Sequence, residues 1–122
     1  MIVALEHARL EHLGTLEAPL AAQAHLQILV AHRDSDQYAR EVDRAARAAS
    51  HDALVVLGGP ASLLDKAVYG YLDESLRLIR ASLTRDIPIL GIGLGAHLVA
   101  WALGARTWEG RTRGKPGEFG WS

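Results

Sequence analysis

The chain has 122 residues, of which 49% are hydrophobic and 22% charged, a balance that fits one globular domain and not a disordered chain. Acidic and basic residues are mixed along the chain and nearly cancel, to a formal net charge of -1, which gives no support to nucleic acid binding. The chain has no cysteine, which excludes a disulfide framework, a thiolate zinc site and thiol catalysis.

The remaining bulk features point away from nucleic acid and membrane partners. One basic cluster, Arg106, Arg111, Arg113 and Lys115, is interpreted as solvated loop charge. No apolar run approaches the ~20 residues that a membrane span requires. The apolar start of the chain has no basic region before it, so it is interpreted as a first strand and not a signal peptide. We therefore expect a cytoplasmic protein.

Four apolar runs predict the strands of a parallel sheet, at residues 2–7, 26–32, 53–57 and 87–92. Each run is nearly continuous, as is typical of parallel strands that are covered on both faces.

The segments between and after these runs predict helices. The first three carry apolar stripes at helical spacing: Leu13, Leu16, Leu20 and Ala24; Tyr38, Val42, Ala45 and Ala49; Val68, Leu72, Leu76, Ile79 and Leu83. Thr15 is a candidate N-cap of the first helix, and Pro19 falls in its first turn. The fourth helix, from Gly95 or Ala96 to about Leu103, is apolar nearly all round and is expected to be buried. The alternation predicts a doubly wound, mostly parallel sheet in a three-layer αβα fold, with residues 1–122 as one domain.

Two glycine turns stand at strand ends, where ligands bind in such sheets. They are Gly58-Gly59-Pro60 after the third strand and residues 91–95 after the fourth. A strand-to-helix elbow presents one side chain to a substrate and offers the following N–H groups to an oxyanion. The residue at that point is Gly93, and a glycine there removes both the backbone strain and the nucleophile.

Two interpretations of these glycines remain open. In one, the N–H groups of Leu94, Gly95 and Gly59 form a cradle for a small anion at the positive end of the helix dipole. In the other, the glycines only permit tight turns and close helix packing.

Residues 88–100 read Pro-Ile-Leu-Gly-Ile-Gly-Leu-Gly-Ala-His-Leu-Val-Ala and resemble the nucleophile motif of class I glutamine amidotransferases, Pro-x-Leu-Gly-Ile-Cys-Leu-Gly-Ala-Gln-Leu-Leu-Ala. Further segments resemble the GMP synthase-like members of that family in the right order: Glu6-His7 with residues 13–16, then residues 52–62, 72–80 and 117–121. The resemblance covers most of the chain.

The resemblance implies a flavodoxin-like fold and a cofactor-free reaction. Members of the family release ammonia from glutamine through a cysteine thioester, assisted by a His and a Glu, and pass the ammonia to an acceptor. This chain has Gly93 at the cysteine position and His97 at the Gln position, and it ends before a His-x-Glu pair could occur. We therefore expect a truncated amidotransferase domain, lacking the C-terminal part of the family fold, that is inactive by itself.

The resemblance carries the oxyanion cradle over to Gly59 and Leu94, with Gly58, Gly95 and His97 beside it. Its expected partners are glutamine or another small anion, and a partner synthase subunit. Alternatively, the domain is a non-catalytic binding or assembly module, in which an uncovered sheet edge pairs as a homodimer or with another chain.

A nucleotide-binding domain is the third possibility. Gly91-x-Gly93-x-x-Ala96 follows a strand and opens a helix, as a dinucleotide fingerprint does. It belongs to the fourth strand and not the first, however, and no acidic residue stands about 20 residues further on at a strand end.

The histidines allow a further alternative. His97 either lines the site or packs, and packing is favoured. His7 and His32 end strands on the ligand side and could converge with His97 on a metal, but three strand ends would have to meet, so no metal site is predicted. Glu74 is interpreted as part of a solvated helix face.

Overall fold

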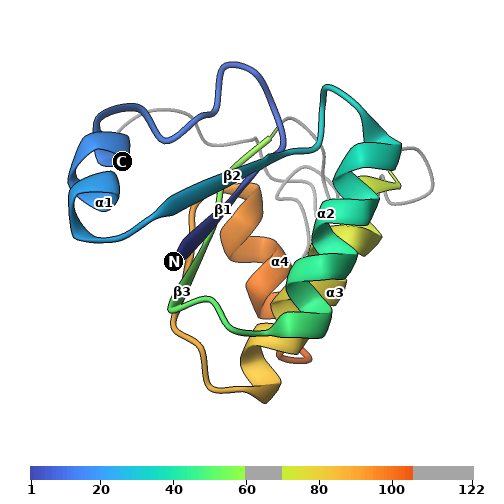
Figure 1. Cartoon of the computed structure of the whole chain (residues 1–122). Helices are drawn as coiled ribbons and strands as arrows, with labels where there is room; N and C mark the ends of the chain where they lie inside the picture. The colour runs from blue at the N-terminus through green and yellow to red at the C-terminus, as the bar shows by residue number, and fades with distance from the viewer. Residues whose placement is uncertain (60–69, 106–122) are drawn as a thin grey trace.

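The structure is a computed structural model and describes residues 1–59 and 70–105 (Figure 1). Four parallel strands form one sheet in the order β2-β1-β3-β4. Their bounds are β1 (Ile2–Glu6), β2 (Leu26–Val30), β3 (Ala53–Val56) and β4 (Ile89–Gly91). Each strand lies inside one of the four predicted runs, so the predicted parallel sheet is confirmed.

Helices follow the strands in strict alternation. They are the 3-10 helix η1 (Gly14–Leu16) and the α-helices α1 (Glu17–Gln23), α2 (Ser35–Ala48), α3 (Tyr71–Thr84) and α4 (Leu94–Ala102). In Figure 1, α1 lies on one side of the sheet and α2, α3 and α4 on the other. The three-layer, flavodoxin-like αβα fold is thus confirmed.

The strand register divides the apolar side chains between two clusters. Val3 aligns with Leu54, and the next residues, Ala4 and Val55, align with each other and face the opposite side of the sheet. The larger cluster lies between the sheet face of Val3 and Leu54 and the helices α2, α3 and α4. The smaller lies on the face of Ala4 and Val55, against Leu13 before η1 and Leu20 of α1. Most of the core therefore lies between the sheet and the three later helices.

Two local predictions are wrong. Thr15 is not an N-cap: it lies inside η1, and α1 starts at Glu17 with no side-chain cap at Leu16. Helix α4 is not buried all round, since Leu94 and Leu98 are buried whereas His97 is exposed. The apolar composition predicted an enclosed helix, but within residues 1–59 and 70–105 the side of α4 that carries Leu94 and Leu98 is the one that packs on the sheet and α3.

Pro19 lies in the first turn of α1, as predicted. Val68 lies outside the described residues, and the remaining stripe of the third predicted helix, from Leu72, packs in the larger cluster as α3. No helix in residues 1–59 and 70–105 is long and apolar enough to cross a membrane.

Candidate functional site

The elbow joins β4 to α4 in two residues. Gly93 precedes the first helical residue and has φ 58° and ψ -122°, a conformation that side-chain-bearing residues rarely adopt. Its carbonyl accepts the N–H groups of Ala96 and His97, at 3.0 and 3.3 Å, and the carbonyl of Ile92 accepts the N–H of Gly95 at 2.9 Å. The turn is therefore fixed by its own backbone.

The glycines of the elbow differ in what surrounds them. A Cβ on Gly95 would lie 1.9 Å from the carbonyl oxygen of Val56, and a Cβ on Gly91 would lie 2.8 Å from the nitrogen of Ala96. Both positions exclude any side chain, because helix and strand backbones meet there. A Cβ on Gly93 would lie 3.6 Å from the nearest atom, the Cα of Gly58, which is an ordinary contact. Gly93 thus has room for a side chain, and only its conformation favours glycine.

The two glycine turns lie against each other, as a cradle requires. A Cβ on Gly59 would be 3.3 Å from Cδ2 of Leu94. Leu94 is the first residue of α4, so no carbonyl of its own helix accepts its N–H. The N–H of Gly95, by contrast, is used by Ile92. Of the N–H groups predicted to form a cradle, that of Gly95 is therefore occupied within the turn, whereas Leu94 and Gly59 lie side by side.

The structure places a carboxylate beside the two glycines, which the sequence did not predict. Oε2 of Glu11 lies 3.3 Å from the Cβ position of Gly58 and 3.8 Å from that of Gly59. Glu11 is exposed and comes from the segment between β1 and η1. Only the fold of that segment across the end of β3 brings this charge to the glycines. An anion in the cradle would have a negative neighbour.

Behind the glycine turn lies a buried polar network centred on Ser75 of α3. Nε2 of His7 and the hydroxyl of Tyr38 lie 2.7 and 2.6 Å from its Oγ. Nδ1 of His7 lies 3.0 Å from the carbonyl oxygen of Leu57. Because a carbonyl only accepts, Nδ1–H donates to Leu57, and in a neutral ring Nε2 can only accept. The Ser75 hydroxyl also lies 2.9 Å from the carbonyl oxygen of Tyr71, so its one proton is shared between Nε2 and that carbonyl, and the Tyr38 hydroxyl donates to Oγ.

Burial sets the protonation of this network. It lowers the pKa of His7, against the opposing effect of the Leu57 hydrogen bond, and the nearby His32 lowers it further. Burial also raises the pKa of Tyr38. The His7 ring stacks on Tyr71, with 5.4 Å between ring centroids. The network is thus neutral, and it fastens the end of β1 to α2, α3 and the residue before Gly58.

The other predicted site residues are dispersed. His97 is exposed, so it does not pack as favoured. His32 pairs with Glu6 instead, with 2.9 Å between Nε2 and Oε2. Within residues 1–59 and 70–105 no three potential ligands cluster around a metal position, so the convergence of His7, His32 and His97 does not occur. Glu74 lies in the first turn of α3 and is half-buried, not mid-helix on a fully solvated face.

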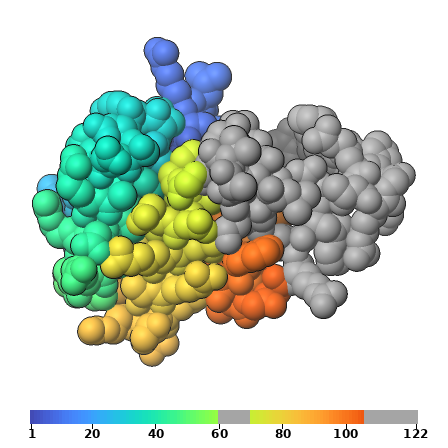
Figure 2. Space-filling model, turned by 90° about the vertical axis from the view of Figure 1, so that its right-hand side faces the viewer, coloured from blue at the N-terminus to red at the C-terminus, as the bar shows by residue number. Residues whose placement is uncertain are grey.

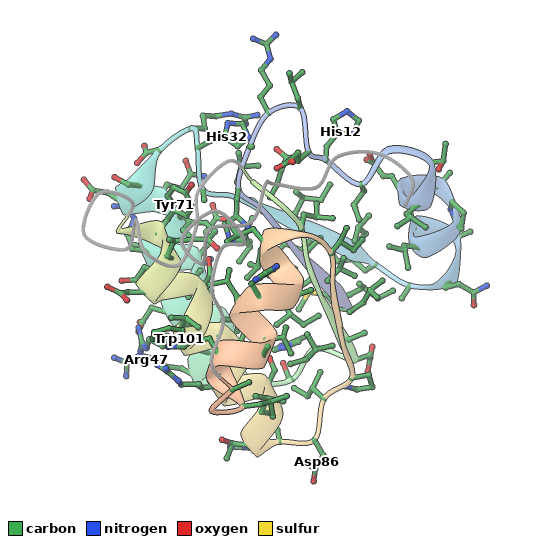
Figure 3. The ribbon with its side chains drawn as sticks, turned by 180° about the vertical axis from the view of Figure 1, so that it is seen from behind. His12, His32, Arg47, Tyr71, Asp86 and Trp101 are labelled. Atoms are coloured by element: carbon green, nitrogen blue, oxygen red, sulfur yellow. The ribbon has the colours of Figure 1, made fainter. Side chains whose placement is uncertain are left out.

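The carboxyl and amino edges of the sheet face opposite ends of the molecule. Figure 3 shows His12 and His32 at one end and Asp86 at the other. Pro60, residues 61 and 62, the basic cluster from Arg106 to Lys115, and residues 117–121 lie outside the described part of the chain.

Comparison with known proteins agrees with this geometry. The family model Glutamine amidotransferase class-I matches residues 17–119. The chain belongs to the class I glutamine amidotransferase family. A glutamine amidotransferase-like protein, L716, of Acanthamoeba polyphaga mimivirus is 41% identical over 54 residues, which make up 44% of this chain and 26% of that protein.

Two solved structures share the fold of this amidotransferase-family chain. A glutamine amidotransferase of Thermotoga maritima matches with a TM-score of 0.65 and 24% identity, over 84% of this chain and 42% of that one. The protein SMU.1228c matches with a TM-score of 0.62 and 25% identity, over 84% of this chain and 43% of that one. The chain thus spans less than half the length of the relatives that it matches.

Proposed function

We propose that this chain is an amidotransferase-family domain that does not hydrolyse glutamine at its elbow. The observation that carries the proposal is Gly93, which holds the positive-φ elbow conformation between β4 and α4 but has no side chain. Formation of a glutamyl thioester requires a thiolate, and the chain has no cysteine. The neighbouring residues, Ile92 and Leu94, offer no hydroxyl in its place.

The cradle that remains supports binding and not reaction. The N–H groups of Leu94 and Gly59 are suited to a carbonyl oxygen or a small anion such as the carboxylate of an amino acid. The carboxylate of Glu11 stands beside them and disfavours a purely anionic ligand. Glutamine, which carries an amide, a carboxylate and an ammonium group, suits these surroundings better than inorganic anions do.

Ammonia release from glutamine tests the proposal. The native chain is expected to release no more ammonia than buffer. Gly93→Cys is expected to be alkylated by a glutamine analogue that carries a chloromethyl ketone, since the thiolate displaces chloride without a general acid, and the adduct is detectable by mass spectrometry of the intact chain. Gly104→Cys is the matched control, because Gly104 also has a positive φ and lies at the other end of α4. Glutamine-dependent ammonia release by the native chain would contradict the proposal.

A role in assembly is the second candidate, and β4 favours it. Leu90 and Ile92 are 52% and 40% exposed, large fractions for apolar side chains on a strand and its end. In the described part of the chain β4 is an edge strand, which can pair with a second copy or a partner subunit.

Size-exclusion chromatography with light scattering tests this role. We expect association in the micromolar range that Leu90→Lys weakens and that Leu103→Lys leaves unchanged. Leu103 is a suitable control because it is 67% exposed at the end of α4, away from the sheet edge. A native chain that is monomeric across this range would refute self-association.

A further inference from the structure

Arginines gather on the outer surface of two adjacent helices. Helices α2 and α3 lie side by side on one face of the molecule (Figure 2). Arg40, Arg44 and Arg47 recur at helical spacing on α2, and Arg77 and Arg80 do so on α3; all five are exposed. We call these five residues the arginine face. They are scattered along two segments of the sequence, and only the helical pitch and the packing of the two helices bring them together.

One carboxylate, that of Asp43 on α2, forms ion pairs with an arginine on each of the two helices. Asp43 accepts Nε of Arg47 at 2.9 Å, and its other oxygen accepts the guanidinium of Arg77. Arg77 first, and then Arg47, hold the pKa of the Asp43 carboxyl below its ordinary value. Figure 3 shows Arg47 projecting away from the body of the molecule.

The rest of the face lacks carboxylate partners. Arg40, Arg44 and Arg80 form no ion pair with any residue in 1–59 or 70–105. The nearby carboxylate Glu41 accepts a hydrogen bond from the side-chain amide of Gln37 instead, at 2.7 Å. Three guanidinium groups are therefore available to an external acid.

The surroundings select the class of partner. None of the large apolar side chains that are exposed in the described residues lies on α2 or α3, so the face has nothing to insert into a lipid surface. The net charge of the chain is -1, whereas nucleic acid-binding domains are strongly basic. The carboxylates of Glu41 and Asp43 among the arginines would also repel a continuous phosphate backbone. Carboxylates that are spaced along a protein surface can pair with the guanidinium groups and avoid these two.

We propose that the arginine face is a docking surface for an acidic segment of a partner protein. The absence of exposed large apolar side chains on it makes the complex charge-driven and transient, with an association rate that falls as salt is added. The five arginines lie in the middle and later turns of α2 and α3, and none lies in the first turn, where each helix leaves the carboxyl edge of the sheet. A partner bound there leaves the cradle of Leu94 and Gly59 open. The proposal does not depend on whether the elbow binds glutamine.

Fluorescence anisotropy with a labelled peptide of alternating glutamate and serine tests the docking surface. At low ionic strength the native chain is expected to bind the peptide, and added salt is expected to weaken the binding. The double variant Arg44→Gln, Arg80→Gln should bind roughly tenfold more weakly, as the loss of two exposed ion pairs predicts. Neither arginine has an ion pair to lose, and glutamine and arginine have similar helix propensities, so the variant keeps its fold.

The double variant Arg9→Gln, Arg33→Gln is the matched control. It removes the same charge from two exposed arginines outside α2 and α3 and should bind as the native chain does. Equal losses in the two double variants would overturn the proposal, because net charge alone would then explain the binding. It would also be overturned if the peptide did not bind at low ionic strength. Tighter binding of a DNA duplex that depends on Arg44 and Arg80 would instead make the face a nucleic acid site, contrary to the proposal.

Discussion

Each edge of the sheet is joined to α3 by a hydrogen bond between a histidine and a serine, yet only the carboxyl edge forms a candidate site. At the carboxyl edge His7 bonds Ser75, and at the amino edge His51 bonds Ser82, with 2.8 Å between Nε2 and Oγ. The two serines stand about two helical turns apart on the inner side of α3, and all four side chains are buried. The histidine–serine pair is thus a fastening device of this fold and not a mark of chemistry.

The difference between the edges lies in the backbone. At the carboxyl edge Leu57, whose carbonyl accepts the hydrogen bond from His7, is followed by Gly58 and Gly59, and these lie against the positive-φ elbow at Gly93. At the amino edge His51 is followed by Asp52, whose carboxylate pairs with the terminal amino group of Met1 in solvent. The candidate site is distinguished from the amino edge by positive φ and by a backbone approach that only glycine allows, and not by its polar side chains.

Gly95→Ala is the change expected to damage the carboxyl edge most. The added Cβ would lie 1.9 Å from the carbonyl of Val56, and backbone cannot give way as a flexible side chain does. We expect the free energy of unfolding to fall by about 3 kcal/mol or more in urea titrations. Gly70→Ala is the control, because no atom of residues 1–59 or 71–105 lies within 4 Å of its Cβ position. Similar stabilities for the two variants would show that α4 does not pack on β3 as described.

Replacing each histidine by leucine compares the two fastenings directly. His7→Leu leaves the carbonyl of Leu57 without its buried donor and takes from Ser75 one of its partners, at an expected cost of about 2 to 3 kcal/mol in unfolding free energy. His51→Leu loses only the hydrogen bond to Ser82, which keeps its hydrogen bond to the carbonyl of Leu78. We therefore expect the free energy of unfolding to fall by about 1 kcal/mol.

His7→Asn provides a rescue test in the same urea experiment. Its amide N–H can replace Nδ1–H as a donor to Leu57, so this variant should recover part of the stability that His7→Leu loses. If His51→Leu proved as costly as His7→Leu, the carboxyl edge would have no special dependence on its network.

The pH dependence of stability should reveal both pairs at once. Burial lowers the pKa of His7 and of His51 below the ordinary value of 6.5. Below that pH the unfolded chain binds more protons than the native one, so stability falls as pH decreases from about 6.5. The expected slope is up to about 1.4 kcal/mol per pH unit for each histidine. His7→Asn should remove part of the slope measured between about pH 7 and 5.5, and an unchanged slope would exclude His7 as a contributor.

The sequence predicted the secondary structure far better than the site. Continuous apolar runs such as the one at residues 53–57 predicted the strands, and apolar stripes at helical spacing predicted the helices. Both are local signals. The approach of Glu11 to Gly58, the network around Ser75 and the burial of His51 depend instead on the packing of distant segments.

The smallest expected effect is a shift in the pKa of a thiol placed at the elbow, which reports the electrostatic field at the carboxyl edge. The chain has no cysteine, so alkylation of Gly93→Cys and Gly104→Cys by iodoacetamide reports one thiol at each end of α4. The helix dipole should lower the thiol pKa at position 93 by about half a unit relative to position 104. The carboxylate of Glu11 opposes this shift, so adding Glu11→Gln should lower the pKa further. If the thiol at position 93 stayed the less acidic one even without Glu11, the N–H groups of the cradle would not stabilise negative charge, and the elbow would be a packing turn alone.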